Sequence, residues 1–280
     1  MKKSKDEIRG AVKKHYGEAV KHRSGCGCGP SDIKVDGVIA ERIAQAHGYT
    51  NDDLGSLPEG VASFGCGNPL TFAQVKEGDV VLDLGSGPGL DLILAARKVG
   101  DRGKVIGLDM TPEMVETCRT NLQKANATNA EVRQGEMESM PVADSEVDWI
   151  ISNCVINLSP EKEKVFAEAY RVLKPGGQMM ISDIVTVNLP EDVRNDMRAW
   201  VGCIAGAVEE DEFIELAKNA GFEEVRIVAR QSYSTSALQD FASSDCGCGC
   251  YPDDHCEGQA VAGDWAGKVA SVRLYARKPR

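Results

Sequence analysis

The sequence lacks long apolar segments, an excess of basic residues and internal repeats. None of its 280 residues falls in an uncharged apolar run of about 20 residues, the length that a bilayer-spanning helix needs. Its 32 Lys and Arg are outnumbered by 43 Asp and Glu, which gives a formal net charge of -11. An acidic chain gains nothing from neutralising phosphates and offers no basic surface to anionic lipids. We therefore expect no nucleic acid and no membrane among its partners.

The N-terminal segment is basic, but it lacks the apolar stretch that follows the charges in a secretory signal. Ile8, Val12 and Tyr16 recur at helical spacing, which predicts an amphipathic helix. We therefore expect a cytoplasmic protein, and this expectation bears on the ten cysteines. In a reducing compartment, cysteines are expected to bind, react or pack rather than to form a disulfide framework.

Strand-like and helix-like segments alternate between residues 76 and 185. This alternation is typical of parallel βαβ units and predicts an α/β fold with helices on both faces of the sheet. Strands are expected at 79–85, 104–109, 130–136, 147–155 and 178–185, and helices at 89–100, 111–126 and 160–177.

The rhythm changes after residue 185. We expect two helices, 190–207 and 209–221, and two strands, 222–230 and 270–278, that could complete the sheet. The chain then divides into an N-terminal helical and Cys-Gly segment (1–60), a nucleotide-binding core (61–185) and a C-terminal α+β portion (186–280). The last portion would hold a substrate-site insertion, the sheet-completing strands and a Cys-rich loop.

A glycine-rich turn follows the first expected strand, in "VLDLGSGPGLD". Gly85, Gly87 and Gly89 allow a sharp turn and a close approach of the backbone to a ligand at a helix N-terminus. Asp109 ends the second strand about 20 residues later, where an acid can accept hydrogen bonds from ribose hydroxyls. The turn, strand, helix and acid together predict a nucleotide-type cofactor. A dinucleotide-dependent dehydrogenase is the alternative, although the G-x-G-x-G spacing disfavours it.

With "GLDMTPEMV" and "YRVLKPGG", this motif resembles the class I S-adenosylmethionine-dependent methyltransferases over roughly residues 76–185. The resemblance implies a Rossmann-like sheet and S-adenosylmethionine as cofactor. It places Asp83 beside the methionine part, Asp109 at the ribose, and Met137 and Glu138 at the adenine. It also places Asn153 and Cys154 beside the transferred methyl. The implied cofactor-binding residues are Asp83, Gly85, Gly87, Gly89, Asp109, Met110, Met137, Glu138 and Asn153.

Three cysteines are expected near the same edge of the sheet. Cys154 follows the fourth strand, Cys203 lies in the insertion after the fifth, and Cys66 lies on the loop "SFGCGNPLTF" before the first. Three converging thiolates would make a soft trigonal site that selects thiophilic centres. No His or carboxylate stands next to any of them in the sequence, as a mixed zinc site would often show. We expect Gly65 and Gly67 to make the Cys66 loop mobile.

The segments "FGCGNP", "SNCVINL" and "GCIAGA" resemble the arsenite methyltransferases. The resemblance implies that Cys66, Cys154 and Cys203 bind trivalent arsenic, whose lone pair attacks the methyl group of S-adenosylmethionine. Arsenite and methylarsenite would be substrates, mono- and dimethylated arsenicals the products, and glutathione or thioredoxin the thiol reductant. Methylation of a small organic acceptor such as a quinone or sterol stays open, as does a protein that only sequesters a metal or metalloid.

The remaining cysteines receive weaker interpretations. Cys26 and Cys28 could be auxiliary arsenite ligands or a regulatory pair, or a flexible segment with exposed thiols. A C-terminal group near His255 could bind zinc, a soft metal or spare arsenic, or be a simple loop. We expect Cys118 on the outer face of its helix as a packed or surface bystander. The C-terminal group comprises Cys246, Cys248, Cys250 and Cys256.

Overall fold

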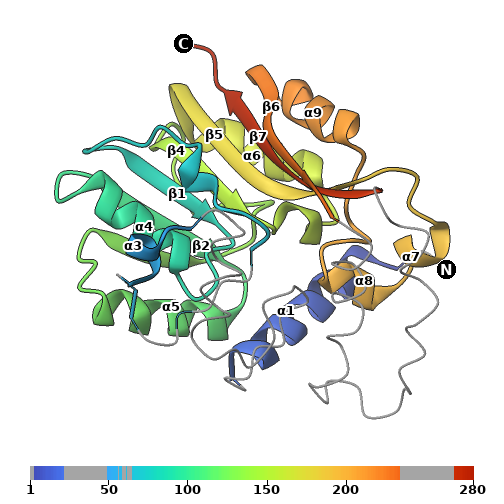
Figure 1. Cartoon of the computed structure of the whole chain (residues 1–280), viewed down its shortest axis with the longest axis horizontal. Coiled ribbons are helices and arrows are strands. Elements are labelled where there is room, and N and C mark those ends of the chain that lie inside the picture. Colours follow the sequence, from blue (N-terminus) through green and yellow to red (C-terminus); the bar gives the residue numbers. More distant parts are fainter. Residues whose placement is uncertain (1–2, 22–48, 56, 59–60, 62–64, 234–267) are drawn as a thin grey trace.

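The computed structural model describes residues 3–21, 49–55, 57–58, 61, 65–233 and 268–280 (Figure 1). Seven strands of this described part form one sheet in the order β3-β2-β1-β4-β5-β7-β6. Strands β1 to β5 run parallel, and β7 pairs antiparallel with both β5 and β6. The predicted α/β class and the two sheet-completing strands are confirmed. The strands are β1 (Val80–Leu84), β2 (Lys104–Asp109), β3 (Ala130–Gln134), β4 (Val147–Asn153), β5 (Leu173–Thr186), β6 (Glu223–Ser232) and β7 (Val269–Arg277).

Helices cover both faces of the sheet (Figure 1). Successive side chains of a strand point to opposite faces, so each strand contributes to two cores. Leu82 and Leu84 join one core with α6 and α9, while Val81 joins the other core with α4 and α5. The described helices are α1 (Lys5–Lys21), α3 (Asn51–Gly55), α4 (Leu90–Val99), α5 (Pro112–Lys124), α6 (Lys162–Val172), α7 (Glu191–Arg194), α8 (Met197–Val201) and α9 (Glu210–Asn219), with short 3-10 helices η1 (Pro69–Thr71) and η2 (Ile156–Leu158).

The strand order reverses at β1. The chain passes from β1 to β2 and β3 on one side and then returns to pair β4 with the other side of β1. In open α/β sheets, such a reversal leaves a crevice at the carboxyl ends of the strands, where ligands bind. The connections that follow β1, β2 and β4 therefore meet at one edge of the sheet.

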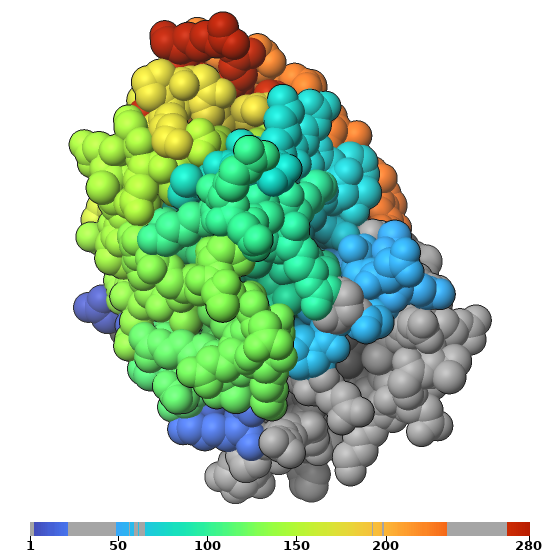
Figure 2. All heavy atoms as spheres, turned by 90° about the vertical axis from the view of Figure 1, so that its left-hand side faces the viewer, coloured from blue at the N-terminus to red at the C-terminus, as the bar shows by residue number. Residues whose placement is uncertain are grey.

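Helix α1 lies at this edge, toward the opposite end of the molecule from the C-terminal residues (Figure 2). It contacts α5 and α8. Ile8 and Val12 are buried, and Tyr16 packs against the same cluster and donates a hydrogen bond to the Val201 carbonyl oxygen (3.0 Å). The predicted amphipathic helix is confirmed, and its apolar stripe faces the crevice.

The predicted helix over 160–177 is too long. Helix α6 ends at Val172, and β5 begins at once with Leu173. Pro175 has no backbone N–H for a helical hydrogen bond, and Gly176 has a φ of 80° that a helix does not allow. The segment we expected to end the helix therefore enters the sheet instead.

The predicted helix over 190–207 is divided into α7 and α8. Asn195 and Asp196 separate the two, as expected of side chains that favour caps and turns over helix interiors. After α8 the chain turns, and Cys203 adopts a φ of 63°. Cys203 therefore lies in a tight turn and not on a helix.

Candidate functional site

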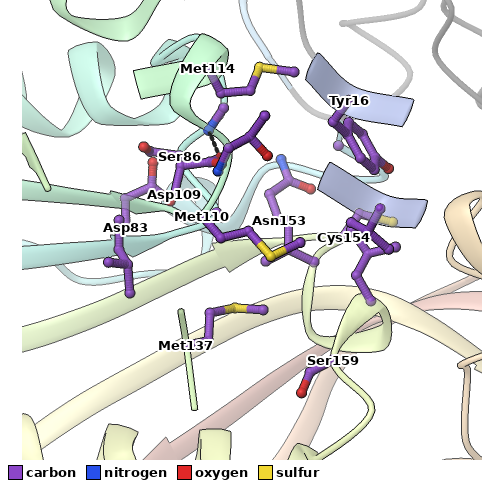
Figure 3. Close-up of a pocket in the computed structure, with 18 of the residues that line it drawn as sticks. Tyr16, Asp83, Ser86, Asp109, Met110, Met114, Met137, Asn153, Cys154 and Ser159 are labelled. Atoms are coloured by element: carbon purple, nitrogen blue, oxygen red, sulfur yellow. Dashed lines mark hydrogen bonds between the residues drawn. The ribbon is translucent and has the colours of Figure 1, made fainter. Parts of the chain in front are cut away.

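A cleft opens at the carboxyl ends of β1, β2 and β4 (Figure 3), with an empty volume of about 960 Å³ that includes its mouth. Figure 3 shows the side chains of Met110 and Met137 extending into the cleft, and Tyr16 and Cys154 together on one side of it. The predicted site residues that line it are Asp83, Gly85, Gly87, Asp109, Met110, Met137, Glu138, Asn153 and Cys154.

The glycine-rich turn is held against the end of β2. The Leu108 carbonyl oxygen accepts hydrogen bonds from the amides of Gly85 (2.7 Å) and Ser86 (3.0 Å). Asp109 accepts a further one from the Gly87 amide (3.0 Å). Gly85 and Gly87 have φ values of 66° and 51°, which favour glycine. The turn and the acid that we expected to share one ligand therefore also bind each other.

Gly89 has a different place from the one expected. It precedes α4 with a φ of 96°, and it is not among the residues that line the cleft. A Cβ atom there would lie 2.8 Å from the Cys118 sulfur. Cys118 is fully buried behind this turn, and burial raises the pKa of its thiol to about 12. Its expected place on the outer face of the helix is wrong, while packing is confirmed.

Asp83 contributes a buried carboxyl group to the wall of the cleft. Its side chain is 2% exposed, and its Oδ2 atom has no hydrogen-bond partner in the described part of the chain. Burial raises its pKa, and the charges of Asp91 and Asp109 raise it further. A ligand that brings a cationic hydrogen-bond donor to this oxygen would satisfy it.

Cys66 and Cys154 bring their sulfurs within 4.8 Å of each other beside the cleft, and Cys203 belongs to the same buried cluster without entering that close group. All three are buried free cysteines of one cluster. The neighbouring thiols of Cys203 and Cys66, together with burial, raise the pKa of the Cys154 thiol. The Cys203 thiol also donates to the Cys154 carbonyl oxygen (2.9 Å). Of the three, only Cys154 lines the cleft, so it joins the thiol cluster to the ligand pocket.

Asp183 stands beside this cluster, although the sequence shows no acid next to the cysteines. One of its oxygens and the sulfurs of Cys66 and Cys154 lie within 4.8 Å of one another. The carboxylate accepts hydrogen bonds from Ile184 N and Asn157 Nδ2 (both 2.8 Å), and burial raises its pKa to about 6. The signal that could have found it is one acid inside the apolar strand "MMISDIV".

The Asn153 side chain holds the Cys66 loop. Its Oδ1 atom accepts hydrogen bonds from the amides of Cys66 (3.0 Å) and Gly67 (3.2 Å). Its Nδ2 atom donates to Asp91 (2.9 Å) and to the Tyr49 hydroxyl (3.1 Å). Neither Tyr49 nor Asp91 was predicted: Tyr49 lies in a segment without a motif, and Asp91 ends the motif "VLDLGSGPGLD", which gives no sign of a contact with the Cys66 loop.

The two glycines beside Cys66 serve close packing. A Cβ atom at Gly65 would overlap the Asn153 amide, and one at Gly67 would overlap the Ser182 hydroxyl. These contacts give the glycines a second reason, close approach, and the expected mobility of the loop stays a prediction. Cys66 therefore has a defined place against the sheet.

Helix α1 forms one wall of the cleft with Arg9, Val12 and Tyr16. Arg9 donates to Glu161 (2.6 Å) and Glu138 (3.1 Å). Glu138, expected at the adenine, thus also binds α1. The amphipathic pattern predicted this helix but could not indicate which surface it covers.

Some predicted residues lie outside the described part of the chain. These are Cys26, Cys28, Cys246, Cys248, Cys250, His255 and Cys256, whose interpretations stay predictions. In the described residues, no helix is long and apolar enough to cross a membrane.

A family model described as "Methyltransferase domain" matches residues 75–221. An arsenite methyltransferase of Halobacterium salinarum is 44% identical over 84% of this chain and 62% of its own length. The arsenite methyltransferase of Homo sapiens is 35% identical over 79% of this chain and 60% of its own. The chain thus spans about three fifths of these two curated relatives.

A solved structure from Chlamydomonas reinhardtii, titled an arsenic(III) S-adenosylmethionine methyltransferase, is also similar. It is 33% identical, with a TM-score of 0.60 over 86% of this chain and 73% of that one. A demethylmenaquinone methyltransferase of Listeria welshimeri is 32% identical, but over only 43% of this chain. The similarity to arsenic enzymes therefore extends beyond the shared core.

Proposed function

We infer the function from the family, since the chain belongs to the arsenic(III) S-adenosylmethionine methyltransferases. On this premise we propose that it transfers methyl groups from S-adenosylmethionine to trivalent arsenic held by Cys66, Cys154 and Cys203. Mono- and dimethylated arsenicals would be the products. The observation that carries the proposal is the cluster of three buried free thiols, one of which lines the cleft at the carboxyl ends of the strands.

The residues of the cleft fit S-adenosylmethionine. The unpartnered Asp83 oxygen suits the ammonium of its methionine part, and Asp109 suits its ribose. Met110 and Met137 offer apolar side chains to its adenine (Figure 3). When bound there, the cofactor supplies an electrophilic methyl group on a sulfonium.

The three thiols would bind arsenous acid without a protein base. Each thiol proton would leave with one arsenic hydroxyl as water, while one sulfur–arsenic bond forms. The raised pKa of Cys154 is therefore no obstacle, because the thiol need not ionise beforehand. Soft sulfur ligands favour this thiophilic centre over hard cations.

Methyl transfer would need orientation and no proton transfer. The arsenic lone pair is the nucleophile, so there is no proton for a general base to remove. The thiols would hold arsenic at the cleft wall beside Cys154, and most of the rate enhancement would come from that placement. The apolar surroundings of the cluster, including Val12, Leu158 and Val201, would keep water away.

A thiol reductant would complete the cycle. Each transfer raises arsenic from the trivalent to the pentavalent state, and two thiols oxidised to a disulfide would return it. We propose glutathione or thioredoxin for this step, with arsenite and methylarsenite as successive substrates in the cytoplasm. Cys26 and Cys28 are proposed as auxiliary thiols in delivery.

Methylation of an organic acceptor is the alternative, supported by the partial similarity to a demethylmenaquinone methyltransferase. Such an acceptor has no use for three converging thiols, which is why we favour arsenic. A purely sequestering protein would in turn have no use for the cofactor cleft.

The proposal is tested by arsenic speciation after incubating the purified chain with arsenite, S-adenosylmethionine and glutathione. We expect methylarsenicals from the wild type and from Cys118→Ser, a buried cysteine outside the cluster. Cys154→Ser and Cys203→Ser should yield none. A wild type that binds S-adenosylmethionine but forms no methylarsenical would overturn the proposal and direct the search to organic acceptors.

A further inference from the structure

Three polar side chains from distant segments form a buried network under the Cys66 loop. The Tyr49 hydroxyl donates to Asp91 Oδ1 (2.8 Å), with the Gly67 carbonyl oxygen 3.2 Å away. The two N–H groups of Asn153 Nδ2 have three acceptors within hydrogen-bond distance, namely Asp91 Oδ2, the Tyr49 hydroxyl and the Gly67 carbonyl oxygen. All three side chains are at most 9% exposed, so their hydrogen bonds are costly to break.

This network touches both halves of the site. Asp91 and Asn153 line the cleft. The Oδ1 atom of Asn153 accepts from the amides of Cys66 and Gly67 and so fixes the backbone that carries the thiol. Asn153 also directly precedes Cys154, the cysteine at the cleft wall. A shift of the Asn153 side chain would therefore move the backbone of Cys66, and it would occur directly beside Cys154.

We propose that Tyr49, Asp91 and Asn153 are positioning residues that couple occupancy of the cleft to the placement of the Cys66 thiol. The inference rests on the proposed function of the cleft and the cluster. A ligand packed against Asp91 and Asn153 restrains the network, and the restrained network holds Cys66 against its partner thiols. A trivalent arsenical at the thiols then meets a pre-ordered loop and binds more tightly. By linkage, arsenic must tighten cofactor binding by the same factor.

Tyr49 is the informative position. It contacts the Gly67 carbonyl and Asp91, yet it neither lines the cleft nor belongs to the thiol cluster. Tyr49→Phe removes one hydroxyl and keeps the ring. Tyr275 offers a matched control, because its hydroxyl donates to Gln178 (2.8 Å) at the opposite end of the parallel strands.

The experiment measures the dissociation constant of S-adenosylhomocysteine by calorimetry, with and without saturating arsenite. The ratio of the two constants reports the coupling and is insensitive to arsenite bound at remote cysteines. We expect a ratio of about five or more for the wild type and for Tyr275→Phe, the lower end of typical allosteric coupling. Tyr49→Phe should bring the ratio close to one, and so should Cys66→Ser.

A second variant, Asp91→Asn, guards against a folding defect in the first and should lower the same ratio. Wild-type ratios in both Tyr49→Phe and Asp91→Asn would overturn the inference. The inference would also fail if the wild type bound both ligands but its two dissociation constants for S-adenosylhomocysteine were equal. That result would not contradict the proposed function. A wild type that binds neither ligand would overturn the proposed function and the inference with it.

Discussion

At the residue scale, two of the three clustered cysteines have strained backbones. Cys154 and Cys203 both have a φ of 63°, in the left-handed region that residues with a side chain rarely adopt. Their amides are held by the carbonyl oxygens of Ser182 (2.7 Å) and Trp200 (2.9 Å). Such conformations cost about 1–3 kcal/mol each and persist where the surroundings enforce them. The fold thus accepts this cost while both side chains stay in the buried cluster beside the cleft.

The close packing at Gly65 gives the first prediction. In Gly65→Ala, the new methyl group would overlap the Asn153 amide and displace the Cys66 loop. We expect arsenite methylation to fall by about tenfold or more, since a displacement of about 1 Å at a reacting group has effects of this size.

Gly10→Ala is the control for this variant. Gly10 is exposed on α1 with nothing within 4 Å of an added Cβ atom. The Gly10→Ala substitution should raise the free energy of unfolding by about 0.5–1 kcal/mol and leave the methylation rate unchanged. The test compares the arsenite methylation rates of the wild type, Gly65→Ala and Gly10→Ala under identical conditions. A Gly65→Ala enzyme as active as the wild type would contradict the packing role of Gly65.

The buried carboxyl group of Asp91 gives the second prediction. Burial raises its pKa from 3.8 to about 6, against the opposing hydrogen bonds from Asn153 and Tyr49. The folded state therefore binds this proton more tightly than the unfolded state, and the group stabilises the fold as pH falls from above 6 towards 4.

Asp91→Asn lacks this titration. The unfolding free energy of the wild type minus that of the variant should rise by about 2 kcal/mol between pH 7 and pH 4.5. Urea unfolding at the two pH values measures it. A difference that stays constant or falls over this range would show that the carboxyl pKa is not raised.

At the element scale, α1 acts as a cover for the cleft. Two kinds of contact hold it in place: the packing of its apolar stripe and the ion pairs along one of its sides. Arg9, whose side chain is 16% exposed, binds Glu138 and Glu161, while Lys21 pairs with Glu113 near the other end with 60% exposure. Partly buried pairs resist screening better than exposed ones.

The third prediction compares these two ends of α1. Arg9→Ala leaves Glu138 and Glu161 without this cation beside the cleft, which loosens the cover. We expect the KM for S-adenosylmethionine to rise by roughly tenfold, about the effect of losing one good contact. Lys21→Ala should change it less than about twofold. Steady-state kinetics of both variants measure this KM. An equal change of KM in Arg9→Ala and Lys21→Ala would contradict the role of α1 as a cover of the cleft.

Element boundaries also show what sequence patterns miss. The glycine motif and the apolar runs predicted β1, β2 and β4 within a residue or two. The helix over 160–177 was predicted too long because its stop signal, Pro175 and Gly176, lies beyond Val172, where the helix ends; the helix over 190–207 was predicted too long because apolar spacing continues past Asn195 and Asp196. This Asn-Asp pair overrides that spacing.

At the scale of the whole molecule, the sheet brings distant segments to one edge. The cofactor motif could be predicted from the sequence because its residues lie close together in the chain and the type of each residue suits a specific contact with a nucleotide. The place of Cys154 at this edge follows from the expected end of the fourth strand, whereas Cys66 and Cys203 lie on connections whose course the strand pattern left open, and the fold brings all three into one cluster. Their roles in binding stay predictions.

The network partners could not be read in this way. Tyr49 and Asn153 are 104 positions apart, and Asp91 and Asn153 are 62 apart. Asn153 was expected at the cofactor but not as a partner of the Cys66 loop, Tyr49 and Asp91 carried no expectation, and Asp183 is a lone acid in an apolar strand. Long-range polar contacts depend on tertiary packing, which local patterns do not specify.

The central claim is that three thiols hold arsenic at the wall of the cofactor cleft. Anomalous scattering from crystals soaked with arsenite tests it most directly. The account predicts an arsenic peak bonded to the sulfurs of Cys66, Cys154 and Cys203, and its loss in Cys154→Ser. Arsenic found only at other cysteines, with the three clustered sulfurs left unbound, would contradict it.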